Sequence, residues 1–149
     1  MRDETYKRLT LFTHKFKGNV IWRAKKHCAI IDKHLNPAER LLFVFAGQLN
    51  DSPLNIIDTG VVALTTERII VAQKGLIFGY KFISITPDLY NDLSIKSRII
   101  WGTITIDTVK EKVNISNISK SALAEVETQI TSFMDAAKKE YLKKKNENK

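Results

Sequence analysis

Residues 60–75, GVVALTTERIIVAQKG, constrain the fold of this chain more than any other stretch of its sequence. Two runs of aliphatic and β-branched residues, at 61–64 and 69–72, are separated by the polar tetrad TTER. Such side chains favour strands, and a short polar segment between two apolar runs favours a tight turn. The stretch therefore predicts an antiparallel β-hairpin on which a larger sheet can be built.

The tetrad is explained by turn chemistry. The hydroxyl groups of Thr65 and Thr66 can satisfy backbone groups of the turn, and Glu67 keeps the tip hydrated. Arg68 can pair with a carboxylate such as Glu39 or Glu67. We therefore interpret Thr65, Thr66, Glu67 and Arg68 as a structural motif that sets the register of the two strands.

Further strands are predicted on both sides of this hairpin. Residues 41–49 and 99–106 are apolar runs, and 76–85 are expected to form a strand in which Gly79 marks a bulge. Residues 89–97 and 112–116 alternate between polar and apolar side chains, and we expect 89–97 to be an edge strand. About seven strands with short connections are typical of a barrel or sandwich. The chain has 149 residues, 44% of them hydrophobic, which fits one domain with one core.

Both ends of the chain carry apolar residues at steps of three and four, the spacing of amphipathic helices. Residues 4–34 are predicted to be helical, with a kink or break at Gly18 and Asn19, and Pro37 prevents the helix from continuing. A second helix is predicted after residue 119. We expect residues 1–34 to form an N-terminal amphipathic extension, residues 35–143 the main domain, and residues 144–149 a frayed basic tail.

The apolar stripe of the N-terminal extension is too hydrophobic to remain in water. It could dock on its own domain, pair with a partner protein or a second copy, or lie on a membrane surface, and the sequence leaves these options open. The residues that we expect to form this interaction stripe are Leu9, Phe12, Phe16, Val20 and Trp22.

Three motifs together resemble a known family. They are LNPAE at residues 35–39, LTTERI at residues 64–69, and NISNI at residues 114–118, directly before the final helix. In this order and spacing they resemble the bacterial PH (pleckstrin-homology-like) domains of the YokE-like group, over roughly residues 35–137; GRAM domains share the hairpin pattern. The resemblance implies an α+β, mainly β fold. In it, about seven antiparallel strands form a bent barrel closed by a C-terminal helix, here preceded by the N-terminal helical segment.

The net charge of +8 is concentrated at the termini. Residues 1–34 hold nine Lys or Arg and three Asp or Glu, whereas residues 35–134 hold nine and ten. Basic surfaces attract anionic lipid or nucleic acid. The phosphoinositide pocket that the resemblance suggests is disfavoured, because residues 50–58 between the first two strands contain no Lys or Arg. The basic surface that we predict consists of Lys15, Lys17, Arg23, Lys25 and Lys26.

Common catalytic and metal-binding patterns are missing from the sequence. His27 and His34 are seven residues apart, Cys28 is the single cysteine, and the six glycines form no phosphate-binding loop. We therefore expect no enzyme activity, no cofactor, no bound metal and no small-molecule substrate. No apolar run approaches the ~20 residues of a membrane span, and no signal peptide is recognised.

These patterns predict a cytoplasmic, non-enzymatic module that acts in protein–protein interaction or self-assembly, forming a homo-oligomer in the second case. The alternative is peripheral attachment to an anionic membrane surface or to nucleic acid through the Lys-rich terminal helices.

Overall fold

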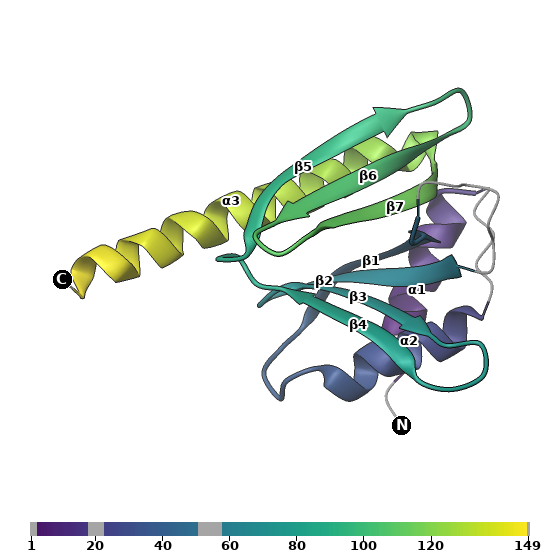
Figure 1. The fold of residues 1–149 in the computed structure, drawn as a ribbon, viewed down its shortest axis with the longest axis horizontal. Coiled ribbons are helices and arrows are strands. Elements are labelled where there is room, and N and C mark those ends of the chain that lie inside the picture. The colour runs from purple at the N-terminus through teal and green to yellow at the C-terminus, as the bar shows by residue number, and fades with distance from the viewer. Residues whose placement is uncertain (1–2, 18–22, 51–57, 149) are drawn as a thin grey trace.

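A curled, seven-stranded antiparallel sheet and three helices make up the computed structural model, which describes residues 3–17, 23–50 and 58–148 (Figure 1). The strand order is β4-β3-β2-β1-β7-β6-β5, so β4 and β5 are its two edges. The strands are β1 (Leu41–Gln48), β2 (Thr59–Thr65), β3 (Ile69–Lys74), β4 (Tyr80–Ile85), β5 (Tyr90–Ser97), β6 (Trp101–Thr108) and β7 (Lys112–Ser119). The helices are α1 (Glu4–Lys15), α2 (Ala24–His34) and α3 (Leu123–Glu147), with a single 3-10 turn, η2 (Lys120–Ala122), before α3.

The sheet bends where its two halves meet. β1 pairs with β2 along its length, but its register with β7 joins Gln48 to Ser116 at one position only. The halves β4-β3-β2-β1 and β7-β6-β5 therefore diverge and form a half-barrel that is open between β4 and β5 (Figure 1). This confirms the predicted seven strands, the C-terminal helix and the edge position of the strand at 89–97.

The hairpin predicted at residues 60–75 is present. Leu64 of β2 pairs with Ile69 of β3, and the tetrad between them forms the turn. Both strands have fully buried apolar side chains because α2 covers one face and the curled sheet encloses the other. The turn residues thus set a register that places every apolar residue of the two strands in the core.

The N-terminal segment forms two helices that pack on the sheet of the same chain. Phe12 of α1 lies in edge-to-face contact with Phe43 of β1, with ring centroids 5.7 Å apart. α2 packs on β3, and the Thr5 hydroxyl ties the two helices together by donating to Asp32 Oδ1 at 2.6 Å. The predicted break falls between α1 and α2; Gly18 and Asn19 themselves lie outside the described residues.

α3 is a long helix that packs on the domain with one half and projects away from it with the other. Its first half buries Leu123, Val126, Ile130 and Met134 against the domain. Its second half extends beyond the sheet, as Figure 1 shows, and residues 144–147, which were expected to belong to a frayed tail, are helical.

The predicted strand at residues 76–85 is wrong in its first part, because β4 begins only at Tyr80. The Gly75 N–H donates to the Gly79 carbonyl at 2.9 Å, which closes a turn over residues 76–78, where an extended strand was expected. Gly79 has a φ of 75°, a conformation that favours glycine, and it ends this turn instead of forming a bulge within a strand.

The ion pair between Glu39 and Arg68 joins the helical segment to the hairpin. Arg68 Nε lies 3.0 Å from Glu39 Oε2, and the Glu39 side chain is fully buried. Arg68 also donates to the His34 carbonyl at the end of α2 and to Ser84 Oγ on β4. Thr65 completes the cluster by donating its hydroxyl hydrogen to Glu39 Oε2. Of the two carboxylates suggested by the sequence, Glu39 is the partner of Arg68.

The hydrogen bonds to Glu39 also govern its ionisation. Burial by itself raises the pKa of this carboxyl, but the hydrogen bonds from Arg68, Thr65 and the Asn36 backbone, together with the Arg68 charge, outweigh burial and lower the pKa below its ordinary value of 4.5. A depressed carboxylate pKa stabilises the fold at pH values above the ordinary pKa. This contribution is lost as the pH falls through the folded-state pKa.

We expect Glu39→Gln to lower the free energy of unfolding by about 2 kcal/mol at pH 7, since it removes charged hydrogen bonds from a buried site. The difference from the wild type should shrink as the pH falls through the lowered folded-state pKa of Glu39, because the wild-type carboxylate is then protonated as well. Urea denaturation at pH 7 and pH 3 measures both effects. Glu67→Gln, at an exposed turn position, is the matched control and should change stability little; equal effects of the two variants would contradict this account.

We expect Phe12→Ala to destabilise the chain by about 3–5 kcal/mol, because it leaves a cavity between α1 and β1. Leu11→Ala, at the neighbouring position of the same helix, should remain within about 0.5 kcal/mol of the wild type. Leu11 is 67% exposed, whereas Phe12 is 4% exposed. Thermal and urea unfolding compare the two variants, and a small effect of Phe12→Ala would mean that α1 is not part of the folded core.

Candidate functional site

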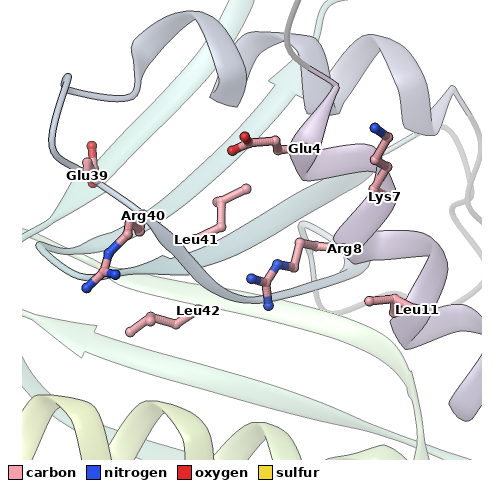
Figure 2. Close-up of a pocket in the computed structure, with 8 residues that line it drawn as sticks. All are labelled: Glu4, Lys7, Arg8, Leu11, Glu39, Arg40, Leu41 and Leu42. Carbon is pink, nitrogen blue, oxygen red and sulfur yellow. The ribbon is translucent and has the colours of Figure 1, made fainter.

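The largest hollow along α1 is an open groove between this helix and the start of β1 (Figure 2). Its volume is about 600 Å³. A smaller hollow of about 160 Å³ shares Arg8, Leu11 and Leu42 with it and continues along α1 toward Glu125 of α3. The lining residues of the larger groove are Glu4, Lys7, Arg8, Leu11, Glu39, Arg40, Leu41 and Leu42.

The floor of this groove is apolar and its rim is largely basic. Leu11 from α1 and Leu42 from β1 are 67% and 40% exposed, which is unusual for leucines beside a packed core. Figure 2 shows Arg8 of α1 and Arg40, the residue before β1, with Leu41 and Leu42 between them. Because Glu39 is held by Arg68, the remaining acidic side chain of the lining is Glu4. We call this feature the α1–β1 groove.

The α1–β1 groove lies where α1 leaves the start of β1 uncovered. α1 places Phe12 over Phe43 and Phe45, so the preceding residue, Leu11, faces outward and is exposed. β1 diverges from β7 before this point, since their register joins only Gln48 with Ser116. The groove is therefore a product of the bend in the sheet, and it can hold an elongated apolar segment against β1.

The predicted interaction stripe has a different position from the groove. Leu9, Phe12 and Phe16 are buried against the chain's own sheet, while Val20 and Trp22 lie outside the described residues. The described side chains thus use their apolar surface within the chain. A partner could reach them only if α1 left the sheet.

The predicted basic residues have local partners of several kinds. Lys15 Nζ lies 2.8 Å from Glu125 Oε2, Arg23 donates to the Gly75 carbonyl, and the Lys25 ammonium lies 5.3 Å from the Tyr6 ring centre. Lys17 and Lys26 are exposed. The Lys-rich end of α3 is exposed as well, and Lys144 lies 3.9 Å from Glu140.

The four residues of the hairpin motif form the β2–β3 turn. The Thr65 hydroxyl accepts from the backbone N–H groups of Glu67 and Arg68, and the Thr66 hydroxyl accepts from the Arg40 N–H. Glu67 accepts a hydrogen bond from the Asn36 side chain at 2.6 Å. Arg68 belongs to the buried ion pair, so these positions are occupied by structural contacts.

Sequence reasoning missed the groove residues Leu11, Leu42, Arg8 and Arg40. Leu11 interrupts the polar face of α1, and this is a signal that the sequence does contain. Leu42 belongs to an apolar strand, and the sequence does not show which residues of that strand are exposed. The exposure depends on the divergence of β1 from β7. The two arginines are ordinary surface residues until the fold brings them to the same groove.

The remaining candidates for chemistry make structural contacts within the chain. His27 Nδ1 accepts from the Lys74 N–H at 2.8 Å, and His34 stacks on Phe82 with ring centroids 4.4 Å apart. Within residues 3–17, 23–50 and 58–148, no three His, Cys, Asp or Glu side chains gather closely enough to hold a metal ion. In the same ranges, no helix has the length and apolar character needed to cross a membrane.

Cys28 is buried, and its thiol is held in the protonated form. Burial, with a smaller contribution from the negative charge of Asp32, raises the pKa of this thiol to about 12. Thiolate is the reactive form of cysteine, so almost none is present near neutral pH. The position suits a small core side chain and not a nucleophile.

We expect Ellman's reagent to leave the native protein unlabelled at pH 8 over the time in which the urea-unfolded protein releases one equivalent of thionitrobenzoate. Cys28→Ser should give no signal in either state. Rapid stoichiometric labelling of the native wild type would show that Cys28 is accessible and more acidic than its surroundings imply.

Residues 35–132 match the family model of the bacterial PH domain, and the chain belongs to this family. The predicted family is thus confirmed, while the narrower YokE-like group stays a prediction. The matched range starts directly after α2, so both N-terminal helices precede it. No curated protein sequence matches the chain.

Solved structures that are similar to this chain include two PH-domain proteins. One is a DUF1696 family protein with a pleckstrin-homology domain from Shewanella loihica PV-4, with 11% identity, 76% of this chain and 98% of that chain covered, and a TM-score of 0.48. The other is a pleckstrin homology domain from Shewanella amazonensis SB2B, with 13% identity, 83% and 98% covered, and a TM-score of 0.49.

Proposed function

We propose that this bacterial PH domain is a non-enzymatic protein-binding module whose α1–β1 groove takes a segment of a partner protein. The groove of about 600 Å³, with exposed leucines under a basic rim, is the observation that carries this proposal. A PH-like fold by itself does not define a ligand, so the proposal depends on the groove and not on the family.

The chemistry of the groove specifies the segment that fits it. Leu11 and Leu42 offer apolar contacts that a partner can desolvate. Arg8 and Arg40 present planar guanidinium groups, which bind carboxylates through two parallel hydrogen bonds. The expected occupant is a segment that places large apolar side chains between Asp or Glu residues. A strongly basic segment is disfavoured by the same two arginines.

The proposal differs from the one suggested by the sequence in the residues that bind. The described residues of the predicted stripe, Leu9, Phe12 and Phe16, are buried, so removing residues 1–34 would expose β1 and β3 and would not be a clean test of binding. Exposed groove positions can be changed without opening the core. They therefore provide the appropriate variants.

A peptide-display library selected on the immobilised full-length chain tests the proposal. Enriched peptides should combine apolar residues with flanking Asp or Glu, and calorimetric titration should show at least tenfold weaker binding to Leu11→Asp with Leu42→Asp, a loss of about 1.4 kcal/mol or more. Val109→Asp is the matched control, since Val109 is 65% exposed at the β6–β7 turn, far from the groove in sequence.

A charge-reversal experiment distinguishes specific binding in the groove from non-specific hydrophobic adsorption. Arg8→Glu with Arg40→Glu should abolish binding of an enriched acidic peptide and permit binding of the same peptide with Lys in place of Asp and Glu. The proposal fails if no peptide is enriched, or if enriched peptides bind the groove variants as tightly as the wild type. If the partner is a second copy of this chain, light scattering should show a mass that rises with protein concentration. The variant Leu11→Asp with Leu42→Asp should then have a lower mass than the wild type.

A further inference from the structure

Large apolar side chains are exposed at the β3–β4 turn and at the first residue of β4. Leu76, Ile77 and Phe78 are 61%, 88% and 83% exposed, and Tyr80 is 55% exposed. None of these residues lines the α1–β1 groove. Contiguous exposed apolar surface on a folded domain marks a place where another molecule binds. We call Leu76, Ile77 and Phe78 the apolar tip.

β4 starts directly after the apolar tip and is an edge strand of the sheet (Figure 1). On one side it pairs with β3, from Tyr80 opposite Lys74 to Ile85 opposite Ile69. In the part of the chain that the structure describes, no strand pairs with its other side. We call this second side the free edge of β4.

Alternate residues of β4 direct their backbone groups toward the free edge. The Gly75 N–H donates to the Gly79 carbonyl at 2.9 Å, so these two glycines form the hydrogen-bonded pair next to the turn. Hydrogen-bonded and non-bonded pairs alternate along an antiparallel ladder. Tyr80, Phe82 and Ser84 belong to the non-bonded pairs, so their N–H and C=O groups point away from β3. These three residues offer a row of donors and acceptors to an added strand.

The other edge strand, β5, is protected against such pairing. The Leu93 N–H donates to Asp92 Oδ1 at 2.8 Å, so a side chain of the strand itself occupies this donor. Asp92 and Lys96 are exposed, and charged side chains on an edge strand oppose the addition of another strand. In β4 the single charged residue is Lys81. The free edge of β4 is therefore the better site for an added strand.

On one face of the sheet, the free edge of β4 is flanked by a fixed aromatic surface. His34 of α2 stacks on Phe82 with ring centroids 4.4 Å apart, and its Nε2 atom lies 3.3 Å from Tyr80 Oη. Arg68 holds Ser84 by donating to its hydroxyl oxygen at 3.1 Å. Phe82 is half-buried and Tyr80 is exposed. An apolar side chain of an added strand can pack on these two rings.

On the opposite face, the free edge borders a hollow of about 220 Å³. Lys81 and Ile83 line this hollow from β4, because successive residues of a strand point to opposite faces. Across the hollow are Glu111 and Lys112, at the β6–β7 turn and the start of β7. Two lysines and one glutamate favour an anionic side chain over a cationic one.

We propose that the free edge of β4 binds an extended segment of a partner protein as an additional strand of the sheet. Backbone hydrogen bonds to Tyr80, Phe82 and Ser84 hold the segment. Its side chains alternate between an Asp or Glu that enters the hollow beside Lys81 and an apolar residue that packs on the aromatic face. The apolar tip lies directly before β4, so a segment longer than β4 contacts it as well.

This site is separate from the α1–β1 groove. The two share no lining residue, and β4 lies three strands away from β1 in the order of the sheet. The groove binds through side chains, whereas the free edge of β4 binds through backbone groups that any extended sequence can match. Side-chain alternation then supplies the selectivity.

A peptide-display library selected on the full-length chain with Leu11→Asp and Leu42→Asp tests the proposal, because these substitutions disable the groove. Enriched peptides should carry acidic and apolar residues at alternate positions, the spacing of a strand, and not at helical steps of three and four. The most enriched peptide, synthesised with acetyl and amide ends, is the probe. Its affinity for the wild-type chain is measured by calorimetric titration.

N-methylation of the probe removes one backbone donor at a time. Methyl groups at alternate positions should weaken binding at least tenfold, because each removes a hydrogen bond to β4 and places a methyl group against the strand. Methyl groups at the intervening positions point to solvent and should change the affinity less than about threefold. A peptide bound through its side chains alone would not show this alternation.

Hydrogen exchange measured by NMR locates the pairing on this chain. The Phe82 and Ser84 amides should exchange at least tenfold more slowly when the probe is bound, since both face the free edge. The Ile83 amide faces β3, where Ile83 is in register with Val71, and it is the internal control. Its exchange should change little.

Side-chain variants test the hollow and the apolar tip. Lys81→Glu should weaken the probe at least tenfold and favour the same peptide with Lys in place of its acidic residues. Ile77→Ser with Phe78→Ser should weaken only probes that extend beyond β4. Lys96→Glu, at an exposed position of β5, is the matched charge control. Thermal unfolding shows whether each variant keeps its fold, as expected for exposed positions.

The proposal is supported if the N-methyl pattern has a period of two, the Phe82 amide is protected, and Lys96→Glu binds the probe like the wild type. It is overturned if no peptide is enriched, if N-methylation shows no alternation, or if the Phe82 amide is not protected. It is also overturned if a second copy occupies the free edge, seen in light scattering as a dimer in which the same amides are protected without peptide. Peptide binding in the α1–β1 groove is measured with different variants, so either proposal can fail without the other.

Discussion

The ion pair between Glu39 and Arg68 is the contact on which the arrangement of this domain depends. It lies where four parts of the chain meet: the end of α2, the segment before β1, the β2–β3 turn and β4. Breaking such a pair is costly because the remaining charge stays buried. Every donor of the Arg68 side chain that faces the cluster has an acceptor there, either the carboxylate, the His34 carbonyl or Ser84. The motif residues at 35–39 and 64–69 are therefore two halves of a single cluster, although they are separated in sequence by the whole of β1.

The N-terminal helices extend this domain beyond the range that matches its family. Their apolar surface covers β1 and β3, and the contact of Phe12 with Phe43 and Phe45 makes α1 part of the same core. An extension used in this way cannot at the same time present its main stripe to a partner. Its contribution to binding is indirect, because it forms one wall of the α1–β1 groove.

The bend of the sheet separates two surfaces of different character. At one end, the divergence of β1 from β7 leaves an apolar groove with arginines on its rim. At the other end, the closed β3–β4 turn holds Leu76, Ile77 and Phe78 in solvent. A concave groove suits a protein segment that can be desolvated along its length.

Local patterns in the sequence determined the elements of this fold. The hairpin at 60–75, the amphipathic ends and the motif at 35–39 follow from neighbouring residues, and turn chemistry and side-chain spacing act over short distances. The tertiary structure alone decided which apolar residues were left exposed. In the sequence, residues 76–78 continue an apolar run, and only the turn closed between Gly75 and Gly79 turns them outward. Leu9 and Leu11 are both leucines of one helix, yet one is buried and the other lines the groove, because burial depends on which face meets β1. Exposure is a property of contacts between distant segments, so the residues that carry the proposed functions could not be separated from the core by sequence pattern alone.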